Sequence, residues 1–282
     1  MILLDGKNTS KNLKDKLKVE VDSLIDKHGL VPTLAIIQVS DNPASQIYVR
    51  NKIKAASYCN INTKHIHLEE SISTEELLKI IDELNNDKTV NGIIAQLPLP
   101  KHINENVIIN HIKEEKDVDG FSVACKGKLF GNMETFTPAT PTGIMTLLQE
   151  YNIDIEGKNA VVVGRSNIVG KPMAMLLLNK NATVTIAHSK TQNLKDVTKN
   201  ADILVVAVGK AKFITKDMVK EGSVIVDVGI NRIDDKVYGD VDFENVKEIA
   251  GYITPVPGGV GPLTIVTLLE NTVKAYKNQI RK

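Results

Sequence analysis

Four runs of nearly unbroken valine, isoleucine and alanine constrain the fold of this 282-residue chain more than any other feature. They begin at residues 159, 182, 201 and 222, and they read NAVVVG, ATVTIA, ADILVVAVG and GSVIVDVG. Such runs are typical of parallel strands that are buried on both faces. Helical patterns at 168–178, 194–199 and 215–220 lie between them. We therefore expect a parallel sheet whose two faces are covered by helices.

The first part of the chain carries a second series of the same kind. Buried strands are predicted at 33–39 and 91–97, and a weakly alternating strand at 62–68. Helices are predicted at 44–58 and 74–84, and the second is amphipathic and capped by Ser73 or Thr74. This order predicts another parallel sheet. The expected fold class is therefore α/β with two domains, each built on a mainly parallel sheet.

Two further helices are predicted to link the domains. One covers 141–151, and the other covers 262–280 after the glycine-rich segment VPGGVGP. A proline stands in the first turn of the second helix, where helices tolerate it. We expect this helix to return to the first domain. The predicted domains are residues 1–140 with the C-terminal helix 263–282, and residues 141–262.

Composition excludes several classes of protein. The net charge of +1 provides no overall field for nucleic acid or a membrane surface. The two cysteines, Cys59 and Cys125, form no C-x-x-C motif and no metal-binding spacing, which favours a reducing compartment. No apolar run approaches a membrane span, and the apolar start is too short for a signal peptide. We expect a cytoplasmic protein without a metal, a nucleic-acid partner or a membrane partner.

A glycine turn follows the first run of the second series. Gly164 ends the predicted strand and Gly170 lies near the start of the next helix, in the pattern G-R-S-x-x-x-G. Ser166 stands where the standard dinucleotide motif has its second glycine, and the loop is one residue longer. Such a turn can serve only to reverse the chain. Its place at the first strand-to-helix turn of a parallel series favours phosphate binding and a Rossmann-like dinucleotide-binding domain.

The next strand bears on the choice of cofactor. NAD sites usually place an acidic residue about 20 positions further on, to hold the ribose hydroxyls. Here the strand is followed by His188, Ser189 and Lys190, with no acid. Arg165 and Ser189, together with Lys190, could form an anion site for a 2′-phosphate, so we favour NADP. The alternative is that Ser189 and Lys190 form a solvated loop.

Polar residues also accumulate in the predicted first domain. Tyr48 and Lys52 are spaced i, i+4 on one helix face, and Gln96 comes at the end of a buried strand. Ligands of open α/β sheets bind outside the carboxyl ends of strands, which points to a site here. The alternative is an amphipathic helix with a lysine that extends to solvent.

Two turns leave alternatives open. The segment KDVDGF contains Asp117 and Asp119, and a carboxylate there could hold an amino-pyrimidine ring or merely form a turn. The segment PGGVGP could let a flat ligand lie against the backbone, or it could be a hinge before the last helix.

Taken in order, eight segments resemble the bifunctional methylenetetrahydrofolate dehydrogenase/methenyltetrahydrofolate cyclohydrolase family over nearly the whole chain. They are PASQIYVRNK, GIIAQLPLP, KDVDGF, PATPTGI, VVVGRSNIVGKPMA, AHSKT, VDVGIN and PVPGGVGPLT. The chain departs from the family pattern at three positions. Ser40 stands where a glycine is common, Ala139 where a cysteine is common, and Leu263 where a methionine is common. None of these removes a polar group expected to do chemistry.

The resemblance implies roles for individual residues. Lys52 is the catalytic lysine, oriented by Gln96, Tyr48 packs on the pterin, and Asp119 binds the polar edge of the pterin. The residues expected to border NADP are Gly164, Arg165, Ser166, Ser189 and Ile230, and those expected to shape the folate site are Pro257, Gly258 and Gly259. The resemblance also implies a homodimer.

The resemblance implies that 5,10-methylenetetrahydrofolate is oxidised with NADP and then hydrolysed to 10-formyltetrahydrofolate, in one shared cleft. Loss of hydride leaves a cation spread over N–C–N, so the first step mainly needs positioning of two rings. Hydration needs proton transfer, which a lysine with a lowered pKa can supply. The alternatives are an NADP-dependent dehydrogenase of a small amino or hydroxy acid, and a non-catalytic dinucleotide sensor.

Overall fold

A computed structural model describes residues 1–234 and 236–280, which form two compact units. Unit 1 consists of Met1–Ser10 and Pro138–Thr264, and unit 2 consists of Lys11–Thr137 and Ile265–Lys282. Helices α1 (Gly6–His28) and α10 (Val260–Ile280) each begin in unit 1 and continue in unit 2. The C-terminal helix was predicted to reach residue 282, but residues 281–282 lie outside the described part.

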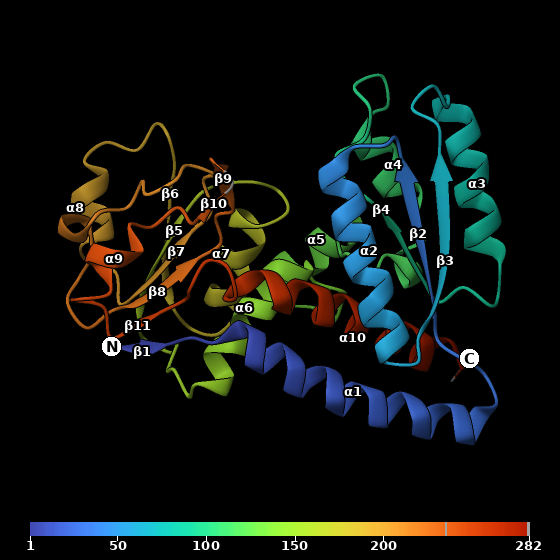
Figure 1. Cartoon of the computed structure of the whole chain (residues 1–282), viewed down its shortest axis with the longest axis horizontal. Coiled ribbons are helices and arrows are strands. Elements are labelled where there is room, and N and C mark those ends of the chain that lie inside the picture. The colour runs from blue at the N-terminus through green and yellow to red at the C-terminus, as the bar shows by residue number, and fades with distance from the viewer. Residues whose placement is uncertain (235, 281–282) are drawn as a thin grey trace. The chain divides into compact units, whose positions relative to one another are not determined.

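Unit 2 is built on a parallel sheet in the order β3-β2-β4 (Figure 1). Its strands are β2 (Thr33–Val39), β3 (Asn62–Leu68) and β4 (Gly92–Ala95), and its further helices are α2 (Pro43–Tyr58), α3 (Thr74–Asn86), α4 (Glu105–His111), η1 (Glu114–Lys116) and α5 (Val123–Phe130). The strands and helices predicted at 33–97 are thereby confirmed, although β4 is shorter than expected and α4 and α5 were not predicted.

Apolar packing fixes the central strand β2. Ile37 pairs in register with Ile66 of β3 and Ala95 of β4. On one face, β2 packs in a buried cluster with Ile81 of α3 and Ile108 of α4. Ser73 is the N-cap of α3: its side chain accepts from the Glu76 amide, and the Glu76 carboxylate accepts from the Ser73 amide. This capping box explains where α3 begins.

Unit 1 contains, among the described residues, a parallel six-stranded sheet in the order β1-β11-β8-β7-β5-β6 and a small antiparallel hairpin. The strands are β1 (Ile2–Leu3), β5 (Asn159–Val163), β6 (Thr183–Ala187), β7 (Ile203–Val206), β8 (Val224–Asp227) and β11 (Tyr252–Ile253), with β9 (Asn231–Ile233) and β10 (Lys236–Tyr238) in the hairpin; the helices are α6 (Ala139–Glu150), α7 (Gly170–Leu178), α8 (Leu194–Thr198), η2 (Lys216–Met218) and α9 (Phe243–Val246). The chain runs from β5 outward to β6 and then crosses to β7, so the strand order reverses at β5. Such a reversal is typical of the Rossmann-like domain that the sequence predicted, although the sequence did not predict the strand order.

Two predictions for unit 1 were wrong in detail. β6 was expected to be buried on both faces, but it is the edge strand and is exposed at Thr183, Thr185 and Ile186. The helix predicted at 215–220 is only the short 3₁₀ turn η2. β5, β7 and β8 are buried as expected, because they lie inside the sheet.

The N-terminal helix α1 was not predicted, because its sequence looked uniformly polar. Its apolar side chains at Leu13, Leu17, Val21 and Leu24 recur every three or four residues and therefore lie along one stripe of the helix. Leu17 and Val21 are buried.

Within residues 1–234 and 236–280, no helix combines the length and apolar character needed to cross a membrane.

Candidate functional site

The amine of Lys52 and the amide of Gln96 meet in unit 2. Lys52 lies on α2, and its Nζ donates to Gln96 Oε1 over 2.9 Å. Gln96 directly follows β4 and is fixed twice: its backbone N–H bonds Ile37 O, and its Nε2 donates to Leu97 O. The strand end therefore holds the amide oxygen that orients the lysine. Tyr48 lies one turn before Lys52 and is 45% exposed, so its ring is accessible.

Asp119 is presented by a turn that is anchored on both sides. Lys116 is 5% exposed, and its Nζ donates to the carbonyls of Leu84 and Asp87 at the end of α3. The carboxylate of Asp117 accepts from the amides of Phe121 and Ser122 at the start of α5. The sequence drew attention to Asp117 but missed Lys116, whose signal is a lysine inside a turn bounded by buried segments.

The turn is also held from the last helix. The side chain of Asn271, on α10, donates to the carbonyls of Val118 and Thr137. Gly120 has a φ of +65°, and a Cβ there would lie 2.7 Å from Phe136 O. Only glycine fits this position without strain. Asp119 is therefore held by a backbone that has little freedom.

Lys52 and Asp119 are electrostatically coupled. Burial lowers the pKa of Lys52, and the negative charge of Asp119 opposes that shift. Burial raises the pKa of Asp119 to about 6, while the Lys52 charge lowers it and the Asp117 charge raises it. A lysine that loses its proton more readily than a free lysine can serve as a base near neutral pH. The site can therefore both accept a proton and provide a negative charge.

A hollow of about 570 Å³ lies along the carboxyl edge of the sheet of unit 2. Its lining includes Ser40, which follows β2, Glu70, which follows β3, and Pro98, which follows β4. Ligands of parallel sheets bind at this edge. Gln96 lies between β4 and Pro98, so the lysine–glutamine pair belongs to the same edge.

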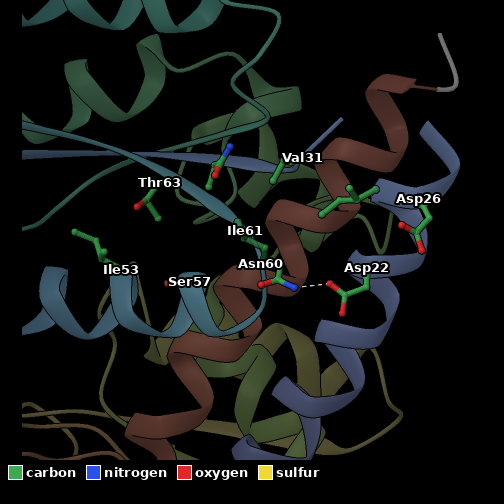
Figure 2. A pocket seen from close by; sticks show the side chains of 10 residues that line it. Asp22, Asp26, Val31, Ile53, Ser57, Asn60, Ile61 and Thr63 are labelled. Carbon is green, nitrogen blue, oxygen red and sulfur yellow. Dashed lines mark hydrogen bonds between the residues drawn. The ribbon is translucent and has the colours of Figure 1, made fainter. Parts of the chain in front are cut away.

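A larger groove of about 730 Å³ lies at the opposite edge of the same sheet, where the strands begin. Its lining includes Asp22 and Asp26 of α1 and Ile53 and Ser57 of α2, and Figure 2 shows Asn60 bonded to Asp22. The Asp22 carboxylate is already held by Asn60 and Lys18, whose hydrogen bonds lower its pKa. None of the residues singled out from the sequence line this groove.

In unit 1, the glycine loop closes tightly after β5. Gly164 has a φ of +131°, and a Cβ there would lie 2.4 Å from Ala207 O. A Cβ on Gly170 would lie 2.3 Å from Gly164 O. Ser166 Oγ accepts from the amides of Val169 and Gly170, so this serine holds the turn that leads into α7. The loop is thus shaped by close backbone contacts, as a phosphate loop must be.

The remaining cofactor candidates also lie at the carboxyl edge of the sheet of unit 1. β5 and β6 end side by side at Val163 and Ala187, and Arg165 and Ser189 each follow two residues later. Both side chains are exposed, and Ile230, after β8, is 49% exposed. Their positions at neighbouring strand ends allow a shared ligand.

The PGG segment has a neighbour within unit 1. Gly258 has a φ of +108°, and its carbonyl accepts from the Lys7 amide. A Cβ on Gly6 would lie 1.8 Å from Gly259 O, so the start of α1 packs directly on this segment. At Gly259, the segment that approaches the backbone closely is therefore the start of α1.

The family described as tetrahydrofolate dehydrogenase/cyclohydrolase matches this chain twice, by its catalytic domain at residues 4–119 and by its NAD(P)-binding domain at residues 138–280. The chain belongs to this family. A relative called bifunctional protein FolD, from Streptococcus agalactiae, is 55% identical over 97% of this chain and 96% of its own length. The family predicted from the sequence is confirmed: the chain is a methylenetetrahydrofolate dehydrogenase and cyclohydrolase with an NAD(P)-binding domain.

Two solved structures share the fold. The bifunctional enzyme FolD from Campylobacter jejuni is 52% identical, covers 99% of both chains and superposes with a TM-score of 0.97. The dehydrogenase-cyclohydrolase of Trypanosoma brucei, solved with NADP cofactor and an inhibitor, is 35% identical, covers 100% of this chain and 99% of its own, and also gives a TM-score of 0.97. The predicted fold class is confirmed.

Proposed function

We propose that this chain oxidises 5,10-methylenetetrahydrofolate with NADP and hydrolyses the methenyl product to 10-formyltetrahydrofolate, with Lys52 as the catalytic group. The observation that carries this assignment is the 2.9 Å bond from Lys52 Nζ to Gln96 Oε1, at a strand end and beside the charge of Asp119. The prediction that both steps share one cleft remains part of the proposal.

Lys52 is assigned the proton transfers of the hydrolytic step. Water attacks the electron-poor methenyl carbon, and its proton passes to the neutral Lys52 amine. The ammonium then returns that proton to the ring nitrogen as the C–N bond breaks. The hydroxyl of the intermediate releases its own proton to solvent as the formyl C=O bond forms, so the neutral lysine is regenerated. Burial lowers the pKa of Lys52, which supports this role because it enlarges the neutral fraction. Gln96 holds the amine, Tyr48 stacks on the pterin, and Asp119 accepts from its amino group and ring N–H.

The NADP assignment rests on unit 1. When bound, NADP supplies the hydride acceptor. Gly164 and Ser166 leave a narrow backbone loop for the pyrophosphate, and Arg165 and Ser189 provide exposed donors for a 2′-phosphate. The Trypanosoma brucei relative was solved with NADP, which supports the same choice here. Ile230 borders the cofactor, and Pro257 with its two following glycines shapes the folate site.

A coupled assay tests the function. Purified protein is mixed with methylenetetrahydrofolate and NADP, and the methenyl and then the 10-formyl products are followed by absorbance. Formation of both products is expected. A panel of small amino and hydroxy acids serves as the comparison, and turnover of any of these instead would favour a different dehydrogenase. NADP binding without turnover of any substrate would favour a dinucleotide sensor.

We also propose that residues 1–140 with helix 263–282 form the folate domain and residues 141–262 the NADP domain, apart from Met1–Ser10, which belong to unit 1 through the pairing of β1 with β11. Buried contacts of α10 within unit 2, such as Tyr276 with the carbonyl of Leu30, support the first assignment. Deletion from Thr264 onward should destabilise the folate domain. A truncated protein with full melting temperature and activity would contradict this.

A cytoplasmic homodimer completes the proposal. The free edge of β6 is one surface at which two copies could pair, since edge strands offer unpaired backbone groups. Cys59 and Cys125 are both buried free thiols, which supports a reducing compartment. Sedimentation equilibrium at micromolar concentration tests the dimer.

A further inference from the structure

Two aspartates with almost no solvent exposure stand at the carboxyl edge of the sheet of unit 1, and neither has a role in the proposed function. Asp227 is the last residue of β8 and is 2% exposed, and Asp240 follows β10 and is 0% exposed. Burial of a carboxylate is costly unless hydrogen bonds compensate for the lost water. The hydrogen bonds that the two carboxylates accept therefore indicate which backbone segments they hold in place.

Asp240 holds the loop that follows β7. Its Oδ2 accepts from the amides of Val208, over 2.6 Å, and Gly209, over 2.9 Å. Its Oδ1 accepts from the amide of Lys210, over 2.8 Å, and from Asn231 Nδ2, over 2.9 Å. Three successive backbone amides thus converge on one carboxylate. β7 is the strand beside β5 where the strand order reverses, and dinucleotides bind at such a reversal.

Asp227 holds the segment that follows β8. Its Oδ1 accepts from the amides of Gly229 and Asp240, and its Oδ2 accepts from the amide of Val241. Burial raises the pKa of Asp227 to about 6, and the backbone donors oppose that shift. The carboxylate of one aspartate thus fixes the main chain of the other. The two side chains form a single network.

Glycines make room for both carboxylates. A Cβ on Gly229 would lie 2.2 Å from Asp240 Cγ, and a Cβ on Gly239 would lie 1.9 Å from Asp227 Oδ2. Each glycine packs against one member of the pair, so no larger residue fits without displacing a carboxylate. The network is therefore closely fitted.

Several of these bonds end on the two sides of the residue expected to border the cofactor. Gly229 and Asn231 flank Ile230, and they are bonded to Asp227 and Asp240 respectively. The loop 208–210 is the other segment held. We propose that Asp227 and Asp240 are positioning residues for the cofactor: they fix the backbone of 208–210 and of Ile230 that walls the dinucleotide crevice. This inference rests on the proposed function, because it takes this edge to be the NADP site.

The test is calorimetric titration of the full-length protein with NADP. Asp240→Asn preserves size but replaces one acceptor oxygen by an NH₂ group, which faces donors. The NADP dissociation constant should rise by at least about tenfold, the usual worth of a hydrogen bond to a charged group. Cyclohydrolase activity on the methenyl substrate, which consumes no cofactor, should stay within twofold of wild type, as expected from a role confined to the cofactor.

Asp202→Asn is the matched control. Asp202 lies beside the start of β7, at the amino edge of the same sheet, where it accepts from the Asn159 amide and from Lys220 Nζ. The same chemical change there should leave NADP affinity unaltered. Equal losses of NADP affinity in both variants would overturn the proposal, because the network would then act only through the stability of the sheet.

Asn231→Ala covers the case in which Asp240→Asn does not fold. It removes only the 2.9 Å side-chain bond to Asp240 and the weaker one to Tyr238 O. NADP affinity should fall by roughly 3- to 10-fold, with cyclohydrolase activity retained. Unchanged affinity in a folded Asp240→Asn or Asn231→Ala overturns the proposal. If wild-type protein does not bind NADP, the proposed function itself fails, and that result is separate from any effect of the variants.

Discussion

Unit 2 presents its candidate residues as ionisable side chains, whereas unit 1 presents mainly backbone. In unit 2, Lys52 and Asp119 alter each other's pKa, and Gln96 fixes the amine. In unit 1, the backbone at Gly164 and Gly170 packs closely against neighbouring backbone, and the side chains that follow Gly164 are exposed. Proton transfer needs tuned acids and bases, while a dinucleotide needs amides and shape. Under the proposed function, proton transfer therefore belongs to unit 2 and cofactor binding to unit 1.

The largest expected effect comes from the amine of Lys52. Lys52→Met keeps much of the side-chain stem and removes the proton acceptor. Cyclohydrolase activity should fall by at least about 100-fold, in line with general acid–base contributions of about 10²–10⁴. Dehydrogenase activity should fall less, because hydride transfer depends mainly on ring positioning. The two steps are assayed separately, with methenyl substrate and with methylene substrate plus NADP.

Lys54→Met is the control for that experiment, since Lys54 is exposed on the same helix. It should leave both activities unchanged. The pH profile of the cyclohydrolase step should show a group that titrates below about 10.4, the value of a free lysine. If Lys52→Met retained full cyclohydrolase activity, Lys52 would have no role in the proton transfers, and the contrast between the units would lose its main support.

The next effect concerns cofactor choice in unit 1. Arg165→Ala removes a charge proposed to contact the 2′-phosphate. The Michaelis constant for NADP should rise by roughly 10- to 150-fold, and that for NAD should hardly change. Lys171→Ala is the control, because Lys171 is a nearby exposed cation whose amine bonds Asn167. Equal losses for NADP and NAD in Arg165→Ala would mean that Arg165 does not read the phosphate.

The next prediction concerns the charge of Asp119 and the pH dependence of folate binding. Its pKa is about 6 in the folded protein, so the carboxylate proposed to hold the pterin becomes protonated as pH falls below that value. Folate affinity should therefore fall about tenfold between pH 8 and pH 5, the change in the ionised fraction for such a pKa. Asp119→Asn should bind folate weakly and without this pH dependence, while NADP affinity is retained. Fluorescence titration at each pH measures both ligands.

The same carboxylate should reduce stability. Its folded pKa lies above its ordinary value of 3.8, so the folded state disfavours ionisation. The contribution of Asp119 to stability falls as pH rises from about 4 through about 6. At pH 8, Asp119→Asn should therefore be more stable to urea than wild type, by about 1–3 kcal/mol. Asp26→Asn, at an exposed position on α1, should show no such gain. A less stable Asp119→Asn would mean that the carboxylate is stabilised where it lies.

The sequence predicted most strands because each alternates with a helix and carries β-branched residues. It failed where tertiary context decides. β6 has the same composition as β5 but ends the sheet, and only the strand order reveals this. The apolar stripe of α1 is present in the sequence, but ten lysine, aspartate and glutamate side chains give the helix a low mean hydropathy. Amphipathic periodicity, not mean hydropathy, would have found it.

The candidate site was predicted unevenly for a related reason. Tyr48 and Lys52 share a helix, so their spacing alone places them together. The bond from Lys52 to Gln96 joins residues 44 positions apart, and only the family resemblance suggested it. Asp227 and Asp240 are acids in otherwise apolar or turn segments, and their burial depends on three loops that meet in space. An aspartate with a glycine and a valine close by, as in DVG and GDV, is the signal that could have indicated them.

The smallest effect sharpens the comparison at the ends of the central strands. Unit 1 places a glycine directly after β5, whereas unit 2 places Ser40 directly after β2 with a φ of +76°, although a glycine is common there in the family. The left-handed region costs a residue with a Cβ roughly 1–2 kcal/mol.

Ser40 forms hydrogen bonds through its backbone: its N–H donates to Leu68 O, and its carbonyl accepts from Gln38 and bonds His67. Ser40→Gly should keep these bonds and relieve the strain, less the entropy that glycine loses on folding, for a net gain of about 0.5–1 kcal/mol. Scanning calorimetry should show a melting temperature about 1–4 °C higher. Ser40→Ala separates backbone strain from an effect of the hydroxyl, because it removes the hydroxyl but keeps the Cβ. This variant should not gain stability. A gain in Ser40→Ala equal to that in Ser40→Gly would locate the cost in the hydroxyl, and the two strand ends would then not differ in backbone strain.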